Sequence, residues 1–125
     1  MAIQGLRIIV AEDNKLSQIV LKKKLESAGA SVMIAEDGTE VMTLLGENEA
    51  DLVILDMYMP TMGGQETLEA IRNLPDPGKS QLPVIACTAS VMPGEEVKVG
   101  DRDFQAVTGK PVDFDQLEAI INSLV

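Results

Sequence analysis

The sequence predicts a doubly wound α/β domain, and two observations support this prediction. Short apolar runs alternate five times with stretches of helical periodicity along the 125 residues. Such alternation forces the strands to pair in parallel through right-handed crossovers. The third run, residues 52–55, is apolar at every position, which is typical of a strand buried on both faces. We therefore expect one domain over residues 1–125, with a flavodoxin-like five-stranded parallel sheet of order 2-1-3-4-5 and five helices.

Capping residues and helical periodicity place the helices. Asp37 with Glu40, and Asp113 with Gln116, form capping pairs at the starts of the second and last helices. Gly29 ends the first helix. The expected helices cover residues 14–28, 37–45, 64–73, 91–103 and 113–124.

The first and fourth helices differ in regularity. An apolar face of the first is formed by Leu21, Leu25 and Ala28, and three neighbours widen it: Leu16, Ile19 and Val20. The fourth contains Pro93 and two glycines, so we expect it to be short or irregular. Residues 74–80 form the most loop-like stretch of the chain.

Polar residues follow four of the five expected strands, which cover residues 6–11, 31–35, 52–55, 82–87 and 104–107. Glu12 and Asp13 follow the first strand, and Asp56 follows the third. Thr88 follows the fourth, and Lys110 lies shortly after the fifth. The carboxyl ends of parallel strands share one edge, where ligands bind. That edge should therefore collect three carboxylates, a hydroxyl and an ammonium group.

The three carboxylates favour a Mg²⁺ site. Neighbouring carboxylates at Glu12 and Asp13 repel each other unless a cation or hydrogen bonds compensate, although Asp13 or Asn14 could instead cap the first helix. With Asp56 added, the oxygen ligands suit Mg²⁺, which keeps waters and accepts phosphate oxygens. Transition metals are disfavoured because the chain has no His and its single Cys87 lies in an apolar strand.

Asp56 is the candidate nucleophile of this edge. A carboxylate beside Mg²⁺ can attack a phosphoryl group, while Lys110 and Thr88 contact the phosphoryl oxygens. Each residue also has a structural alternative: an ion pair between Lys110 and Asp56, or a bond from the Thr88 hydroxyl to the backbone. Because four strand ends carry the needed groups together, the functional interpretation is favoured.

Several of these residues form a known pattern: Glu12-Asp13, Asp56 with Pro60, Thr88-Ala89 and Lys110-Pro111. The pattern resembles the receiver domain of two-component response regulators, over essentially the whole chain. The resemblance implies that Asp56 accepts a phosphoryl group from a phosphohistidine on a partner protein.

The resemblance also implies roles for the neighbouring residues. Mg²⁺ is organised by Glu12 (through water), Asp13, Asp56 and the backbone carbonyl of Tyr58. Thr88 moves toward the phosphoryl group, and Lys110 contacts it. The Lys110–Pro111 peptide bond is expected to be cis.

Some positions depart from the usual family pattern. Val107 stands where the family often has an aromatic switch residue. We therefore expect residues 88–92 to carry the switch without an aromatic rotor. Gly63 and Asp103 also differ from the usual residues, and with the weak fourth helix they bring the usual output face into question.

Residues 12–14 and 88–92 are most similar to receivers of hybrid sensor histidine kinases, so we expect such a parent chain. The alternatives are a free-standing single-domain regulator and, less favoured, an unphosphorylated receiver-like module. The last helix reaches Val125, so no output domain is expected. A phosphatase of the haloacid-dehalogenase type would need a second Asp where Tyr58 stands. We therefore expect a phosphoacceptor rather than a turnover enzyme, although a hybrid kinase parent would itself be an enzyme.

Composition narrows the choice of partners. A formal net charge of −10 and only three aromatic residues argue against direct nucleic-acid binding. No segment approaches ~18 apolar residues, and the N-terminus lacks a secretory signal, so we expect a cytoplasmic domain without membrane contact. The chain has no His, so the phosphoryl donor must be a partner. It should dock on the first helix near Leu16 and Ile19 and on the loop 108–112, while a homodimer remains compatible with the sequence.

Overall fold

The computed structural model describes residues 3–88, 99–100, 102–110 and 112–125. Five strands form one parallel sheet of order β2-β1-β3-β4-β5, which confirms the predicted order. The strands are β1 (Arg7–Ala11), β2 (Ser31–Ala35), β3 (Leu52–Asp56), β4 (Val84–Thr88) and β5 (Ala106–Gly109).

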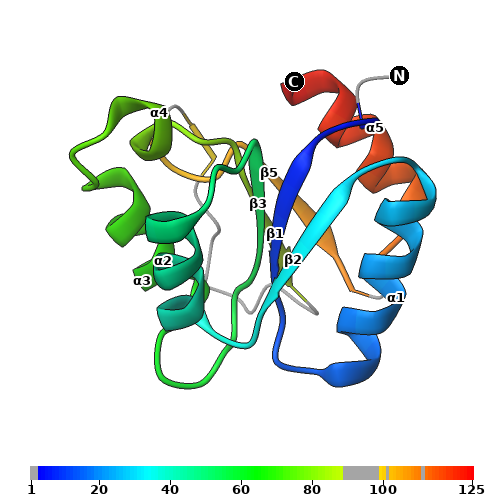
Figure 1. The fold of residues 1–125 in the computed structure, drawn as a ribbon. Coiled ribbons are helices and arrows are strands. Elements are labelled where there is room, and N and C mark those ends of the chain that lie inside the picture. The colour runs from blue at the N-terminus through cyan, green and yellow to red at the C-terminus, as the bar shows by residue number, and fades with distance from the viewer. Residues whose placement is uncertain (1–2, 89–98, 101, 111) are drawn as a thin grey trace.

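Helices cover both faces of the sheet (Figure 1). The helices are α1 (Lys15–Ser27), α2 (Gly38–Glu47), α3 (Gly64–Arg72), α4 (Pro77–Ser80) and α5 (Phe114–Leu124). One face carries α1 and α5, and the other carries α2 and α3. The architecture is the doubly wound α/β fold that the alternating pattern predicts.

The core consists of two apolar layers, one on each face of the sheet. The layer under α2 and α3 includes Ile9, Val53, Leu55, Val84, Val41, Leu45, Leu68 and Ile71. The layer under α1 and α5 includes Ile8, Val10, Leu52, Ile54, Leu21, Leu25, Leu117 and Ile121. Because β3 is central, all five of its residues are buried, and its last residue, Asp56, is held at a rigid edge.

Side-chain caps start four of the described helices, α1, α2, α4 and α5. Asp37 accepts a hydrogen bond from the Glu40 amide, and Asp113 accepts one from the Gln116 amide, which confirms both predicted pairs. Asn14 caps α1 through the amide of Ser17, 3.0 Å away. The cap of α1 is therefore Asn14, and the carboxylate of Asp13 is not needed for that role.

The buried apolar face of α1 is narrower than the sequence predicts, so that part of the prediction is wrong. Only Gln18, Leu21 and Leu25 of this helix are buried. The side chains expected to widen the face are exposed instead: Leu16 at 69%, Ile19 at 63% and Val20 at 43%. The sheet contacts about one residue per turn of α1, and these three lie on the other side of the helix.

The region between α3 and β5 also differs from expectation. The loop-like stretch 74–80 contains the helical turn α4, which Asp76 caps. Most of the expected helix 91–103 lies outside the described residues. Its expected end is wrong, because Val99 forms a parallel bridge with Phe104. The carbonyls of Arg102 and Asp103 accept hydrogen bonds from the Arg72 guanidinium rather than from helix amides.

Candidate functional site

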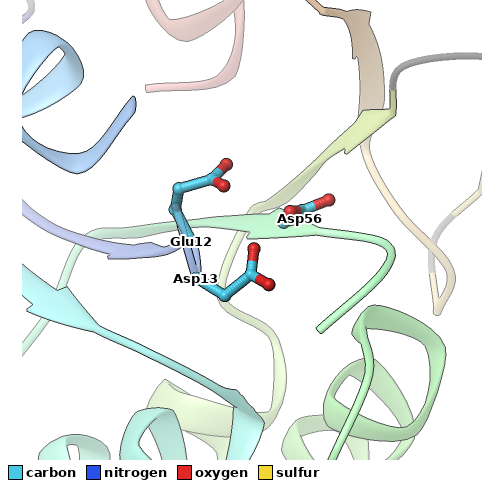
Figure 2. Close-up of side chains that lie close together, drawn as sticks. All are labelled: Glu12, Asp13 and Asp56. Atoms are coloured by element: carbon cyan, nitrogen blue, oxygen red, sulfur yellow. The ribbon is translucent and has the colours of Figure 1, made fainter. Parts of the chain in front are cut away.

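Three carboxyl groups meet at the carboxyl edge of the sheet. Glu12 and Asp13 follow β1, and Asp56 ends β3, the neighbouring strand. Ligand oxygens of the three residues lie within 4.8 Å of one another. Figure 2 shows the three side chains close together at the ends of their strands. Glu12 and Asp56 are buried, whereas Asp13 is exposed. The sequence-predicted acidic residues are thus brought together, with one of them open to solvent.

The turn after β3 holds Asp56 in place. The Asp56 Oδ1 atom accepts a hydrogen bond from the Tyr58 amide at 3.2 Å. The chain then turns back tightly, and the Gly64 amide donates to the Met57 carbonyl. A Cβ atom at Gly64 would lie 2.8 Å from the carbonyl oxygen of Asp56, so a side chain there would push the loop apart. Gly64 therefore has a packing reason to be glycine, whereas the departure from the family pattern lies at Gly63.

Lys110 joins two of the carboxylates. Its Nζ atom lies 2.8 Å from Asp56 Oδ2 and 2.6 Å from Glu12 Oε2. Its backbone amide donates to the Thr88 carbonyl, which ties the end of β5 to the end of β4. The ion pair with Asp56 that was one alternative for Lys110 is present, and it leaves the ammonium group beside the candidate nucleophile.

Both carboxylate oxygens of Glu12 are occupied by protein groups. Oε1 accepts from the Asn14 amide at 3.1 Å, and Oε2 faces Lys110. The Glu12 carbonyl accepts from the Gln18 side chain at 2.6 Å, which fixes the backbone between β1 and α1. Asp13 contributes the exposed carboxylate of the pair, so the two acidic neighbours have different surroundings.

Burial and charge act against each other at this edge. Burial raises the pKa of Glu12, and hydrogen bonds from Lys110 and Asn14 offset only part of that rise. Burial alone would lower the pKa of Lys110, but its bonds to Asp56 and Glu12 outweigh burial and raise it. Because its pKa is raised, Lys110 stays charged at neutral pH and can contact an incoming anion. At the neighbouring strand end, burial raises the pKa of the Cys87 thiol to about 12.

The remaining predicted residues surround Asp56. Thr88 ends β4, is buried, and pairs in register with Gly109. Tyr58 exposes 58% of its surface near the site. Val107 packs against the core layer under α2 and α3. The expected switch beyond Thr88 (residues 89–92) and the expected cis bond to residue 111 lie outside the described residues.

Gln18 is a supporting residue that the sequence reasoning did not identify. It is buried, although it is polar, and it holds the Glu12 carbonyl. Its position three residues before Leu21 and seven before Leu25 puts it on the buried stripe of α1. A polar residue at a core position of a helix is the signal that could have identified it.

Within the described ranges, no helix is both long and apolar enough to cross a membrane.

Comparison with known proteins gives consistent results. The family model described as response regulator receiver domain matches residues 8–122. Sensor histidine kinase AruS of Pseudomonas aeruginosa is 32% identical over 123 residues, which are 98% of this chain and 12% of AruS. The polar-differentiation response regulator DivK of Brucella anthropi is 27% identical over 116 residues, 93% of each chain.

A solved structure has the same fold. The receiver domain of sensor histidine kinase PA1611 from Pseudomonas aeruginosa PAO1 matches with a TM-score of 0.85 and 24% identity, over 96% of this chain and 97% of that one. That structure is described with a magnesium ion coordinated in its active-site cleft. The chain spans only 12% of AruS, so the properties of that whole kinase do not transfer directly.

Proposed function

Because this chain belongs to the response regulator receiver domain family, it is a receiver domain of a two-component system, and we propose that Asp56 is its phosphoacceptor. The observation that carries the proposal is the position of the Asp56 carboxylate. It accepts a hydrogen bond from the ammonium group of Lys110, and its ligand oxygen lies within 4.8 Å of those of Glu12 and Asp13. The match over residues 8–122 supports treating residues 1–125 as one such domain.

The proposed step is phosphoryl transfer from a phosphohistidine to Asp56. A carboxylate oxygen of Asp56 forms a bond to phosphorus, and the bond between phosphorus and the imidazole nitrogen breaks. The electron pair of the broken bond stays on the imidazole. Lys110 moves its ammonium group from the carboxylates to a phosphoryl oxygen, and the Thr88 hydroxyl donates to another. These contacts position the group and neutralise its charge, which is most of what phosphoryl transfer requires.

The acidic residues fit a hard divalent cation. Three carboxylates with ligand oxygens within 4.8 Å of one another form an oxygen donor set of the kind that Mg²⁺ accepts. We assign Asp13 and Asp56 as direct ligands, together with the backbone carbonyl of Tyr58. Glu12 acts through water, as the family resemblance implies, and Lys110 and the Asn14 amide contact its two oxygens in this structure. When bound, Mg²⁺ supplies positive charge that offsets the negative charge of the phosphoryl group.

The donor is a helical protein with a phosphorylated His, and it docks on the outer face of α1. Leu16 and Ile19 are exposed there, close to the chain segment that carries Glu12 and Asp13. Leu16→Asp and Ile19→Asp should slow transfer from the donor and leave the fold intact, because neither side chain is in the core. Full-rate transfer in both variants would contradict this docking surface.

In this proposal the parent chain is a hybrid sensor histidine kinase, and the receiver domain itself lies in the cytoplasm. The similarity to AruS supports it, whereas the similarity to DivK over 93% of both chains keeps the free-standing regulator as the alternative. Flanking coding sequence that encodes neither a kinase core nor a phosphotransfer domain would contradict the hybrid parent.

The direct test of the proposed function uses a small phosphodonor. The purified domain is incubated with acetyl phosphate, with and without Mg²⁺, and its intact mass is measured. A gain of one phosphoryl group that requires Mg²⁺ is expected. An unchanged mass under both conditions would instead identify an unphosphorylated interaction module.

A further inference from the structure

Helix α1 is basic in an otherwise acidic chain. It carries four of the ten basic residues and one acidic residue, so its formal charge is +3 in a chain of −10. Two of its lysines already have partners: Lys15 pairs with Glu36 at 3.0 Å, and Lys24 lies 5.7 Å from the ring centre of Phe114. Lys22 and Lys23 are exposed, and neither forms an ion pair within the described part of the chain. An acidic domain thus keeps two unpaired positive charges on one helix.

Lys23 continues the exposed apolar stripe of α1, and Lys22 lies on its flank beside Ile19. Lys23 follows Leu16 by seven residues, Ile19 by four and Val20 by three, which places all of them on one side of the helix. The stripe starts at the active-site end of α1 and reaches the lysines after about 10 Å, from the rise of 1.5 Å per residue. In Figure 1 this helix lies on the outside of the sheet, with its first turn toward the carboxyl edge.

An apolar groove borders the same stripe. It has a volume of about 240 Å³, and it lies between α1 and the segment leading into α5. Its apolar walls are Leu16, Val20, Leu21, Val112 and Phe114. Glu12 and Lys110 also line it, so the groove opens beside the active-site ion pair. A partner that fills it would place its own reactive group near Asp56.

We infer that the phosphodonor presents an acidic, amphipathic helix to α1. This inference rests on the proposed function and adds the chemistry of the partner. An apolar side chain of the donor helix fills the groove, and carboxylates about 10 Å farther along that helix face Lys22 and Lys23. The net negative charge of the domain repels acidic partners elsewhere, so these lysines select the face on which such a partner lands. Charge pairs of this kind act mainly on the association rate and on partner choice.

The test measures transfer rates from a defined panel of donors. The panel consists of the purified phosphohistidine domains encoded in the source genome, each tested separately on the full chain. Lys22→Gln and Lys23→Gln should each slow transfer from the preferred donor by about twofold to fivefold at low salt. Gln81→Glu is the matched control, because it changes the net charge equally at an exposed position outside α1. Lys23→Arg should keep the parent rate.

Salt and a small donor separate the possible outcomes. The parent rate should fall as ionic strength rises, and the double variant Lys22→Gln with Lys23→Gln should lose most of that dependence. Equal rates in the lysine variants and in Gln81→Glu would overturn the inference, as would a lack of transfer from every donor. Lysine-dependent binding to vesicles with anionic lipids, or self-association through α1, with unaltered transfer rates would overturn it too. Labelling by acetyl phosphate needs no docking, so its failure would count against the proposed function instead.

Discussion

Lys110, which is partly buried, and Arg72, which is buried, are two cations at opposite edges of the sheet, and their surroundings differ in kind. Lys110, at the carboxyl edge, contacts two carboxylates. Arg72, at the end of α3, is 6% exposed, and its guanidinium contacts only neutral oxygens. Its five N–H groups donate to the carbonyls of Ser80, Leu82, Arg102 and Asp103 and to the Gln105 side chain.

Because of this difference, the contacts of Lys110 can be exchanged when a cation or a phosphoryl group binds, whereas those of Arg72 cannot. All donors of Arg72 are satisfied by acceptors that carry no charge to exchange, so Arg72 ties α3 to the starts of β4 and β5. Burial lowers the pKa of Arg72, with a contribution from the nearby Arg102 charge. Lys110 is held by groups that a cation or a phosphoryl group would also attract, so its contacts can be exchanged. In this protein, the cation that contacts carboxylates, Lys110, lies at the functional edge, and the cation that contacts only neutral oxygens, Arg72, has a structural role.

The strongest test of the responsive edge is Asp56→Asn. The amide is not a nucleophile, so Mg²⁺-dependent phosphate incorporation should be lost completely, while the thermal midpoint should not fall. Radiolabel or intact mass measures the first, and thermal unfolding measures the second. Asp115→Asn, at an exposed position in the first turn of α5, is the matched control and should label normally. Continued Mg²⁺-dependent labelling of Asp56→Asn would refute the assignment.

The reactivity of Cys87 tests whether burial has a larger effect on the thiol pKa than the nearby charge of Lys110. Lys110 favours the thiolate, yet burial dominates and raises the thiol pKa to about 12. From its usual value of 9.0, this rise leaves about 1000-fold less thiolate below pH 9. Alkylation at pH 8 should therefore be slow in the native protein and fast in urea, and the single Cys makes the mass readout unambiguous.

The same shift has a consequence for stability. The unfolded thiol ionises near pH 9 while the folded thiol stays protonated, so the free energy of unfolding should fall as the pH rises above 9. In a Cys87→Ala variant, the free energy of unfolding should lack this fall above pH 9.

For the alkylation test, labelling of the native protein as fast as labelling in urea would show that the Cys87 thiol is not buried.

Arg72→Met tests the structural edge. It removes five hydrogen bonds and leaves buried carbonyls such as that of Leu82 unpaired, so we expect a loss of about 3 kcal/mol in the free energy of unfolding. Arg72→Lys keeps the charge but offers fewer donors, so it should lose less. The control is Arg7→Met at an exposed ion pair, where the loss should be much smaller. Denaturant titration measures all three, and equal losses at residues 7 and 72 would contradict the comparison.

Mg²⁺ affinity distinguishes the two acidic neighbours. Asp13→Ala should weaken binding by about tenfold and Glu12→Ala by less, because Lys110 and the Asn14 amide occupy the oxygens of Glu12. The parent affinity should be in the millimolar class. Fluorescence of Tyr58, the single tyrosine, gives a native probe two residues from Asp56. Identical titration curves for the parent and both variants would contradict the assigned ligands.

Much of the fold and the site could be predicted because the signals are local. Strand runs, the Asp37 and Asp113 caps and the parallel connections together predict the sheet order that is observed. The polar residues at strand ends predict the cluster at residues 12, 13 and 56. Gln18 and α4 were not predicted, since a short helical turn and a polar core residue give weak local patterns.

The sequence by itself determined the order of the elements and the edge where the acidic groups meet, because periodicity and parallel pairing are set along the chain. Only the tertiary structure decided that Leu16 and Ile19 face solvent. It also decided that Lys110 bridges Glu12 and Asp56, which are 98 and 54 residues away in sequence. The physical reason is that burial and ion pairing depend on which distant segments cover a side chain. A helical pattern specifies which residues share a face, but not which face the sheet will cover.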